Sequence, residues 1–153
     1  MTLSEYIKRR NGVTIGHSNS LRNNLYRSLG GKNFSTFWNH WNPIFGYFLG
    51  KKVFKPLRRY FSVAISLTLT FIFCGLIHDF VTTLFRGKVS LFFAIWFLYM
   101  GLAVLLSRSV KQDLTGKIWL IRAISNIAII ASTFGFAMST ERFLNSVLDC
   151  FKL

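Results

Sequence analysis

The stretch FIFCGLIHDFV, residues 71–81, places His78 and Asp79 next to each other inside an apolar run. In the surrounding residues 61–84, Asp79 is the only side chain with a formal charge. At about 1.5 Å of rise per residue, a helix of this length exceeds the roughly 30 Å hydrocarbon core of a bilayer. Ionisable residues inside such a segment are costly and usually mark a site, so His78 is the first candidate for function.

Two further stretches have the length and composition of membrane spans. Residues 89–106 carry no charge, and residues 118–138 are interrupted only by Arg122. With 52% hydrophobic residues and a mean hydropathy of +0.40, the chain is predicted to be an all-α, polytopic membrane protein with three transmembrane helices, at 61–84, 89–106 and 118–138. The alternative is a soluble helical bundle, but buried soluble helices rarely run this long without a polar face.

The region before the first span is expected to form short helical pieces at the membrane surface. Residues 1–33 are basic and rich in Asn, Ser and Gly, and a short amphipathic helix is expected at 21–29. From residue 34 onward, aromatic residues recur every three or four positions, which is typical of interfacial or re-entrant helices. Pro43 and Pro56 each remove a backbone donor, so one continuous helix is not expected.

The net charge of +14 is concentrated towards the N-terminus, where eleven of the 19 basic residues precede residue 61. In a chain with three spans, this pattern is more typical of the positive-inside rule and of attraction to anionic lipids than of nucleic-acid binding. With those of residues 107–122, fifteen basic residues share one side, against four on the other. The N-terminus is therefore predicted to be cytoplasmic, in a bacterial inner membrane or its equivalent.

Residues 1–153 show no repeat, low-complexity tract or linker, so a single membrane domain is predicted. Its first part is the basic lead-in of residues 1–33, and its last part, 107–153, holds the third span and a tail. The tail, residues 141–153, is amphipathic and is expected to lie on the membrane surface. In the connection before the third span, Asp113 is expected to cap a helix that begins at residue 114.

The cysteines and histidines do not form a pattern typical of a metal site or a disulfide framework. Cys74 lies in the first span and Cys150 near the C-terminus, so the two are not expected to pair. The three histidines lack zinc-type spacing, and no metal is predicted. Cys74, four residues before His78, is either part of a thiol–imidazole pair or a small buried hydrophobe.

The residues around His78 leave two structural questions open. Gly75 lies one turn before His78 on the same helix face, where it opens a notch either for a substrate or for close packing of another helix. Asp79 points about 100° away from His78, so an ion pair between them is not expected. Asp79 is instead expected to cap the end of a span or to face Arg86.

The densest cluster of positive charge precedes the first span, and two interpretations of it are open. It is either an anchor on anionic lipid headgroups or a site for phosphates, such as those of a coenzyme A donor. Lys55, Arg58 and Arg59 are therefore candidate substrate-binding residues. The cluster as a whole consists of Lys51, Lys52, Lys55, Arg58 and Arg59.

Three stretches occur in an order that resembles the membrane-bound O-acyltransferase (MBOAT) superfamily: FWNHWN at 37–42, KPLRR at 55–59 and FIFCGLIHD at 71–79. The family pattern has Phe-Trp, two residues, Trp and then Asn or His; a basic segment with Pro; and an apolar helix with a small residue, Gly, and His three positions after the Gly. The resemblance covers residues 34–106. The chain departs from the family at Ile77, where many members have Trp, and in having three spans where members have many.

The resemblance implies acyl transfer from a thioester, such as acyl-coenzyme A, to a hydroxyl of a lipid or an envelope glycan, without a bound cofactor. It makes His78 the catalytic histidine and Asn42 the second polar residue of the active site, with Trp38, Trp41 and Gly75 in contact with substrate. Because three helices do not easily seal a tunnel, activity would need a second copy of the chain or a partner membrane subunit. The alternative function is a catalytically inactive scaffold or subunit of a larger membrane complex.

Overall fold

The computed structural model describes residues 1–150, and these residues form only helices and the segments that connect them. The all-α prediction is confirmed. The helical elements, in chain order, are α1 (Leu3–Asn11), α2 (Ser20–Leu29), α3 (Phe34–His40), α4 (Pro43–Leu49), the wider π-helical turn η1 (Gly50–Phe54), α5 (Lys55–Leu57), α6 (Val63–Arg86), α7 (Phe92–Ser109) and α8 (Trp119–Cys150).

Three of these helices, α6, α7 and α8, are long and apolar enough to cross a membrane. Helix α6 starts and ends two residues later than the predicted span of 61–84 because capping groups, rather than the apolar run alone, determine where it starts and stops. Ser62 Oγ accepts a hydrogen bond from the amide of Ile65 at 3.3 Å, which caps the start of α6. Gly87 ends the same helix with φ at 66°, a left-handed conformation that glycine adopts without strain.

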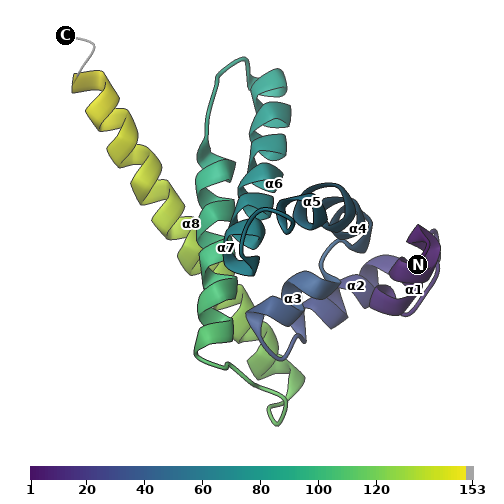
Figure 1. The fold of residues 1–153 in the computed structure, drawn as a ribbon. Coiled ribbons are helices and arrows are strands. Elements are labelled where there is room, and N and C mark those ends of the chain that lie inside the picture. The colour runs from purple at the N-terminus through teal and green to yellow at the C-terminus, as the bar shows by residue number, and fades with distance from the viewer. Residues whose placement is uncertain (151–153) are drawn as a thin grey trace.

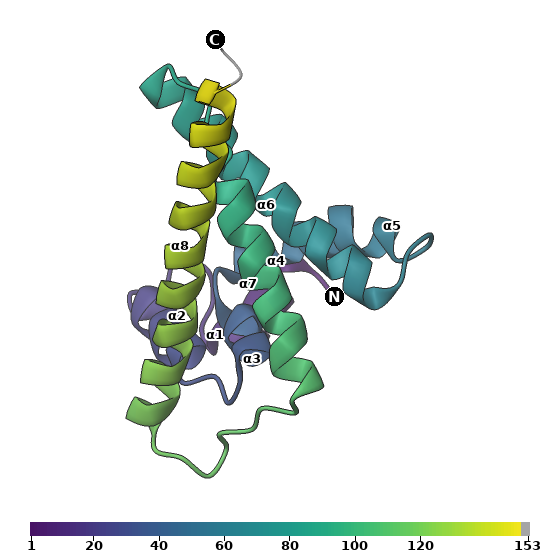
Figure 2. The same ribbon diagram turned by 90° about the vertical axis from the view of Figure 1, so that its left-hand side faces the viewer.

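The three long helices are arranged as an antiparallel bundle in which α7 packs against both α6 and α8 (Figure 1). The connection 87–91 lies at one end of the bundle, and the connection 110–118 lies at the other. Seen from the side, the short helices α1–α3 lie beside the half of the bundle that ends in the connection 110–118 (Figure 2). The N-terminal region therefore packs against the bundle.

Helix α8 is longer than the predicted third span. It continues without a break to Cys150, so residues 141–150 extend the helix and do not form a separate surface segment; residues 151–153 of the expected tail lie outside the described residues. The hydroxyls of Ser139 and Thr140, which directly follow the predicted third span, donate hydrogen bonds to the carbonyls of Gly135 and Phe136, at 3.1 and 2.9 Å. These back-bonds satisfy the hydroxyls inside a helix.

The N-terminal residues contain more regular structure than the sequence indicated. Helix α1 was not predicted; it starts with a capping box in which Thr2 and Glu5 each accept a hydrogen bond from the other's backbone amide. The amphipathic helix expected at 21–29 is present as α2. The predicted break at Pro43 is also present: the chain turns at Asn42, and Pro43 occupies the first turn of α4.

A buried amide in α8 holds the turn between α2 and α3 against the bundle. Nδ2 of Asn126 donates to the carbonyl oxygens of Leu29 and Gly31, both at 2.9 Å, and Asn126 is fully buried. At the start of α8, the Trp119 ring stacks on Tyr26 with centroids 5.3 Å apart. The short helices are thus tied to the long ones by polar as well as apolar contacts.

The connection 110–118 does not contain the predicted helix. Asp113 accepts hydrogen bonds from the amide and the hydroxyl of Thr115, which form a turn, and α8 begins only at Trp119. These hydrogen bonds hold the pKa of Asp113 below its usual value, and the one from the Thr115 hydroxyl has the largest effect. Asp113 also forms an exposed ion pair with Lys32 at 3.5 Å, which joins this connection to the N-terminal region.

Helix α3 supplies the apolar side chains that pack on α6 and α7. Phe34 and Phe37 are almost completely buried there, next to Cys74 on α6 and Met100 on α7. Because Phe34 and Phe37 are three residues apart, they lie on the same face of α3. This packing positions the residues that follow α3.

Candidate functional site

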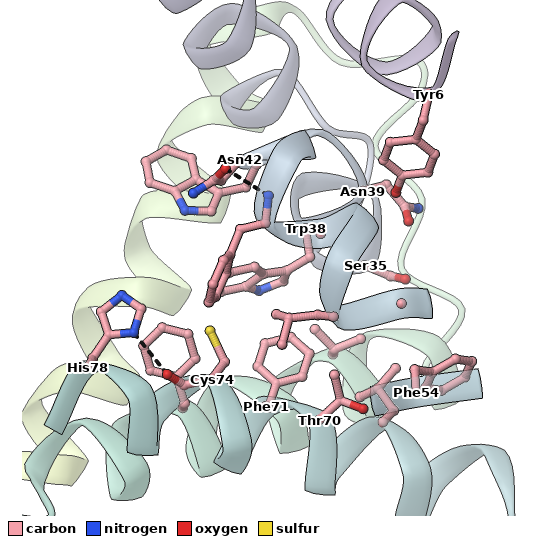
Figure 3. A pocket seen from close by; sticks show the side chains of 18 of the residues that line it. Tyr6, Ser35, Trp38, Asn39, Asn42, Phe54, Thr70, Phe71, Cys74 and His78 are labelled. Carbon is pink, nitrogen blue, oxygen red and sulfur yellow. Dashed lines mark hydrogen bonds between the residues drawn. The ribbon is translucent and has the colours of Figure 1, made fainter. Parts of the chain in front are cut away.

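A cavity of about 300 Å³ lies between the short helices and the α6–α7 pair (Figure 3). Four of the candidate catalytic and substrate-binding residues line it: His78 on α6, Trp38 on α3, and Trp41 and Asn42 in the turn before α4. Asn42 and His78, separated by 36 residues in the sequence, thus contribute to one cavity. This volume is at the lower end of the range for small-molecule sites.

The imidazole of His78 is held in one orientation by its own helix. Nδ1 lies 2.9 Å from the carbonyl oxygen of Cys74. A carbonyl oxygen can only accept, so Nδ1 must carry the proton, and in the neutral ring Nε2 is the nitrogen with a free lone pair. Figure 3 shows this second nitrogen pointing away from α6, towards the side on which Asn42 lies. The contact of His78 with Cys74 is therefore to the backbone carbonyl.

Aromatic rings surround the imidazole. The His78 ring centroid lies 5.1 Å from that of Phe97, 5.6 Å from that of Phe93 and 6.3 Å from that of Phe45. The side chain is nevertheless exposed in the isolated chain. His78 is thus packed between rings of α4 and α7 and remains open to a ligand.

Asn42 owes its position to a helix start. It has φ at 40°, in the left-handed region that asparagine tolerates better than most residues, and its side-chain oxygen accepts a hydrogen bond from the amide of Phe45 at 3.2 Å. The side-chain oxygen of Asn42 therefore already has a hydrogen-bond partner, and the NH₂ group is the part of the side chain that remains available as a donor. Phe45, whose amide binds Asn42, also contacts His78 with its ring. One turn of α4 therefore joins the two polar residues.

The two tryptophans form a wall of the cavity. Trp38 packs edge-on against Phe71, with centroids 5.0 Å apart, and Trp41 stacks on Phe37 at 5.4 Å. On the other side of this wall lies a second, mostly apolar cavity of about 360 Å³. Trp38, Trp41, Phe97 and His78 line both cavities. The imidazole therefore lies where the first cavity, which has several polar lining residues, meets the second, mostly apolar cavity.

Gly75 does not line either cavity; it lies against α7. A Cβ atom at this position would come within 2.5 Å of the carbonyl oxygen of Phe93 and 2.6 Å of the Cα of Ala94. The sequence left open whether Gly75 makes room for a substrate or for another helix, and in the structure it makes room for α7.

Asp79 caps the neighbouring helix. Its carboxylate oxygens accept hydrogen bonds from the amides of Phe93 and Ala94, at 2.9 and 2.7 Å, in the first turn of α7. The side chain is only 3% exposed. Helix N-termini present free amides and a partial positive charge, so a buried carboxylate is stabilised there without a cation. Asp79 therefore closes the α6–α7 contact that Gly75 permits.

The basic candidates Lys55, Arg58 and Arg59 do not line either cavity. All three side chains are exposed, and Arg58 donates a hydrogen bond to the carbonyl oxygen of Phe61 at 2.7 Å, next to the start of α6. The structure thus separates these cations from the cavity that holds His78 and Asn42.

No family model, curated protein or solved structure matches this chain. The role of the cavity has therefore to be inferred from its own side chains. Within residues 1–150, no three His, Cys, Asp or Glu side chains lie close enough together to hold a metal ion.

The cavity also contains polar residues that the sequence did not single out. Arg108 was counted only among the cytoplasmic charges. Asn39 lies within the FWNHWN stretch on α3, but no role was assigned to it, and nothing in the pattern of α1 linked that helix to a site. The only available signal was the position of Arg108 at the end of a span. These additional residues are Tyr6, Ser35, Asn39, Thr70 and Arg108.

Proposed function

We propose that this protein is a membrane-embedded O-acyltransferase in which His78 acts as the general base. The observation that carries the proposal is the hydrogen bond from Nδ1 of His78 to the Cys74 carbonyl, because it makes Nε2 the basic nitrogen, in a cavity also lined by Asn42. The order of the sequence motifs, which resembles that of the MBOAT superfamily, supports the same assignment.

In the proposed reaction, Nε2 of His78 takes the proton of an acceptor hydroxyl as its oxygen attacks the carbonyl carbon of a thioester. A C–O bond forms, and the tetrahedral intermediate collapses with cleavage of the C–S bond. The imidazolium then returns the proton to the leaving thiolate. The products are an ester and a thiol, and no oxidant or reductant is consumed.

Asn42 is proposed to stabilise the oxygen of the tetrahedral intermediate or to hold the acceptor. Its side-chain oxygen is already bound to the Phe45 amide, so the NH₂ group is the part that can donate to substrate. A donor directed at a developing oxyanion typically accelerates a reaction by about 100- to 1000-fold.

The two cavities suit the two parts of an acyl substrate. The larger one is lined mainly by apolar side chains, including Leu29, Met100 and Ile130, and fits a hydrocarbon chain. The smaller one carries the polar residues and fits the group to which the acyl chain is attached. The proposed donor is acyl-coenzyme A or another acyl thioester, and the proposed acceptor is a hydroxyl of a lipid or an envelope glycan.

The proposed membrane orientation places the N-terminus in the cytoplasm. The N-terminal region contacts the connection 110–118 through the Lys32–Asp113 ion pair, so the basic residues of both segments share one end of the bundle. Lys88 and Arg142 are nearer to the other end. Because cytoplasmic segments carry an excess of Lys and Arg, the end with the N-terminal region is assigned to the cytoplasm.

Removal of the imidazole tests the proposal directly. Transfer of label from a panel of radiolabelled acyl-coenzyme A donors is measured in membranes that contain equal amounts of each variant. His78→Ala is expected to lower the rate about 100- to 10,000-fold, the usual contribution of a general base. The matched control is His17→Ala, at an exposed histidine outside both cavities. Equal transfer by wild type and His78→Ala, or no transfer by either, would refute the proposal.

A second candidate function is that of an inactive scaffold or subunit in a larger membrane complex. The exposure of His78 in the single chain favours it, because three helices leave one side of the cavity open. Crosslinking in native membranes tests this candidate: a partner subunit that crosslinks next to His78, together with the absence of transfer by the wild type, would support it. Transfer by the purified chain alone would contradict it.

A further inference from the structure

The cavity that holds His78 contains one fixed positive charge. Among the described residues that line it, Arg108 is the only one with a formal charge at neutral pH, and none is a carboxylate. Its Nε donates to the hydroxyl of Ser35 at 3.0 Å, which leaves the remaining guanidinium donors for other partners. The Arg108 side chain is exposed, and a guanidinium in a cavity without a carboxylate can bind an anionic ligand group.

The polar groups gather at the end of the cavity that is distant from His78. Figure 3 shows Tyr6, Asn39 and Ser35 on one side and His78 on the opposite side, with Phe71 and Cys74 between them. Since Arg108 binds Ser35, its charge belongs to the polar end. The cavity therefore has a polar end that carries the positive charge of Arg108, an apolar middle and the imidazole of His78 at its far end.

The distance between the two ends follows from α7. Phe97, whose ring contacts His78, lies eleven residues before Arg108 on the same helix. At 1.5 Å of rise per residue, the two positions are about 16 Å apart along the helix axis. A ligand that reaches both residues must therefore be elongated and must carry its anionic group far from its reacting atom.

We propose that this cavity binds an elongated substrate whose phosphate pairs with Arg108 while its reacting group lies at His78. The inference rests on the proposed acyl transfer, and it goes further by specifying the chemistry of the substrate at a distance from the reaction. A phosphate fits because guanidinium groups bind phosphate oxygens with two parallel hydrogen bonds. The phosphate belongs either to the carrier of the thioester donor or to a phospholipid acceptor.

Arg108 also has structural roles, which the experiment must separate from binding. It lies in the last turn of α7, where a positive charge is favoured, and it ties that turn to α3 through Ser35. Arg108→Lys keeps the charge but loses the two-pronged hydrogen bonding, whereas Arg108→Gln keeps a polar side chain of intermediate length without the charge. Lys117→Gln removes an exposed cation from the same end of the protein and is the matched control.

The experiment measures ligand binding in the His78→Ala background, so that no turnover occurs. Two pairs of probes are titrated into protein in nanodiscs of neutral lipid: 4′-phosphopantetheine, the phosphate-bearing arm of coenzyme A, against pantetheine, and lysophosphatidic acid against monoacylglycerol. The members of each pair share a chain and differ in phosphate. We expect the phosphate-bearing member of one pair to bind about tenfold more tightly, and Arg108→Gln to abolish that preference. Arg108→Lys is expected to retain part of the preference, and Lys117→Gln all of it.

The pair that shows the Arg108-dependent preference identifies the source of the phosphate, and either pair supports the proposal. If neither pair shows a preference, or if Arg108→Gln leaves the preference intact, the proposal is overturned. Because binding is measured without turnover, Arg108-dependent binding by a protein that performs no acyl transfer would contradict only the proposed function. Acyl transfer with no Arg108-dependent preference would contradict only this inference.

Discussion

At the scale of single residues, the site depends on hydrogen bonds that the backbone makes to side chains. The Cys74 carbonyl determines which nitrogen of His78 is basic, and the Phe45 amide determines which end of Asn42 can donate. Both contacts are made within four residues along the chain, so the two polar groups are oriented locally. The cavity between them, by contrast, requires α3 and α4 to pack on α6 and α7.

Two substitutions at Asn42 separate its role in the fold from its proposed role in catalysis. Asn42→Asp keeps an oxygen that can cap α4 but removes the NH₂ donor, so the fold is expected to be retained while the rate of acyl transfer falls about 100- to 1000-fold. Asn42→Ala loses the cap as well and is expected also to lower the thermal unfolding temperature. Circular dichroism and label transfer measure the two effects. A wild-type rate for Asn42→Asp would show that the amide is not a donor to the reaction.

Two glycines give a matched test of the α6–α7 contact. Gly75→Ala is expected to destabilise the protein by about 1–3 kcal/mol, because the added methyl group meets backbone atoms of α7 that cannot move independently. Gly135→Ala on α8 is expected to be neutral or stabilising by up to about 1 kcal/mol, because a Cβ there meets nothing within 4 Å. Unfolding free energies in mixed micelles measure both changes. Equal stability of Gly75→Ala and wild type would contradict the close contact.

At the scale of helices, the attachment of the short elements to the bundle decides whether the cavity exists. Helix α3 carries Trp38 and precedes Asn42, and its position depends on the Asn126 amide, which binds the carbonyls before and after Gly30. A carbonyl buried within the protein has no water to replace a lost donor. The Asn126 side chain of α8 thus contributes to seating the elements that line the site.

Replacement of Asn126 tests this attachment. Asn126→Ala leaves two buried carbonyls without their donor, so a loss of about 1–3 kcal/mol of unfolding free energy is expected. Hydrogen exchange of the amides in residues 26–37 is expected to become faster, while exchange in α6 and α7 changes little. Asn145→Ala, at an exposed asparagine on the same helix, is the control. Unchanged exchange in residues 26–37 would show that other contacts hold the turn in place.

At the scale of the whole molecule, the distribution of charge around the long helices supports the proposed membrane orientation. Helix α8 has 32 residues. It is about 48 Å long and exceeds the roughly 30 Å hydrocarbon core, so both of its ends reach water. Cys150 is exposed at one end, whereas the other cysteine, Cys74, is buried in α6. The native cysteines therefore allow the orientation to be measured.

Labelling with a membrane-impermeant maleimide tests the orientation. In intact cells, Cys150 is expected to react, because the positive-inside rule places the C-terminal end of α8 outside. In a Cys150→Ser background, Lys117→Cys is expected to react only after the membrane is permeabilised. The reverse pattern would place the N-terminus outside and would also put the polar end of the cavity at Arg108 on the external side.

The sequence alone was sufficient to predict the all-α architecture, the three spans, α2 and the break at Pro43. These features depend on local properties: the length of an apolar run, its periodicity and the backbone restrictions of proline. The predicted end of the third span was wrong because the sequence does not show how polar side chains are satisfied. Ser139 and Thr140 look polar in the sequence, but their hydroxyls are satisfied by the preceding turn of the helix.

What only the tertiary structure decided is which groups meet across the chain. The sequence joined His78 to Asn42 through the order of its motifs, but it could not place Gly75 against α7, give Asp79 the amides of Phe93 and Ala94, or bring Arg108 into the cavity. Hydrophobicity and helix periodicity indicate which face of a helix is apolar, but they do not indicate which other segment covers that face. Partners and cavities arise from packing between distant segments, and that information is carried by the fold.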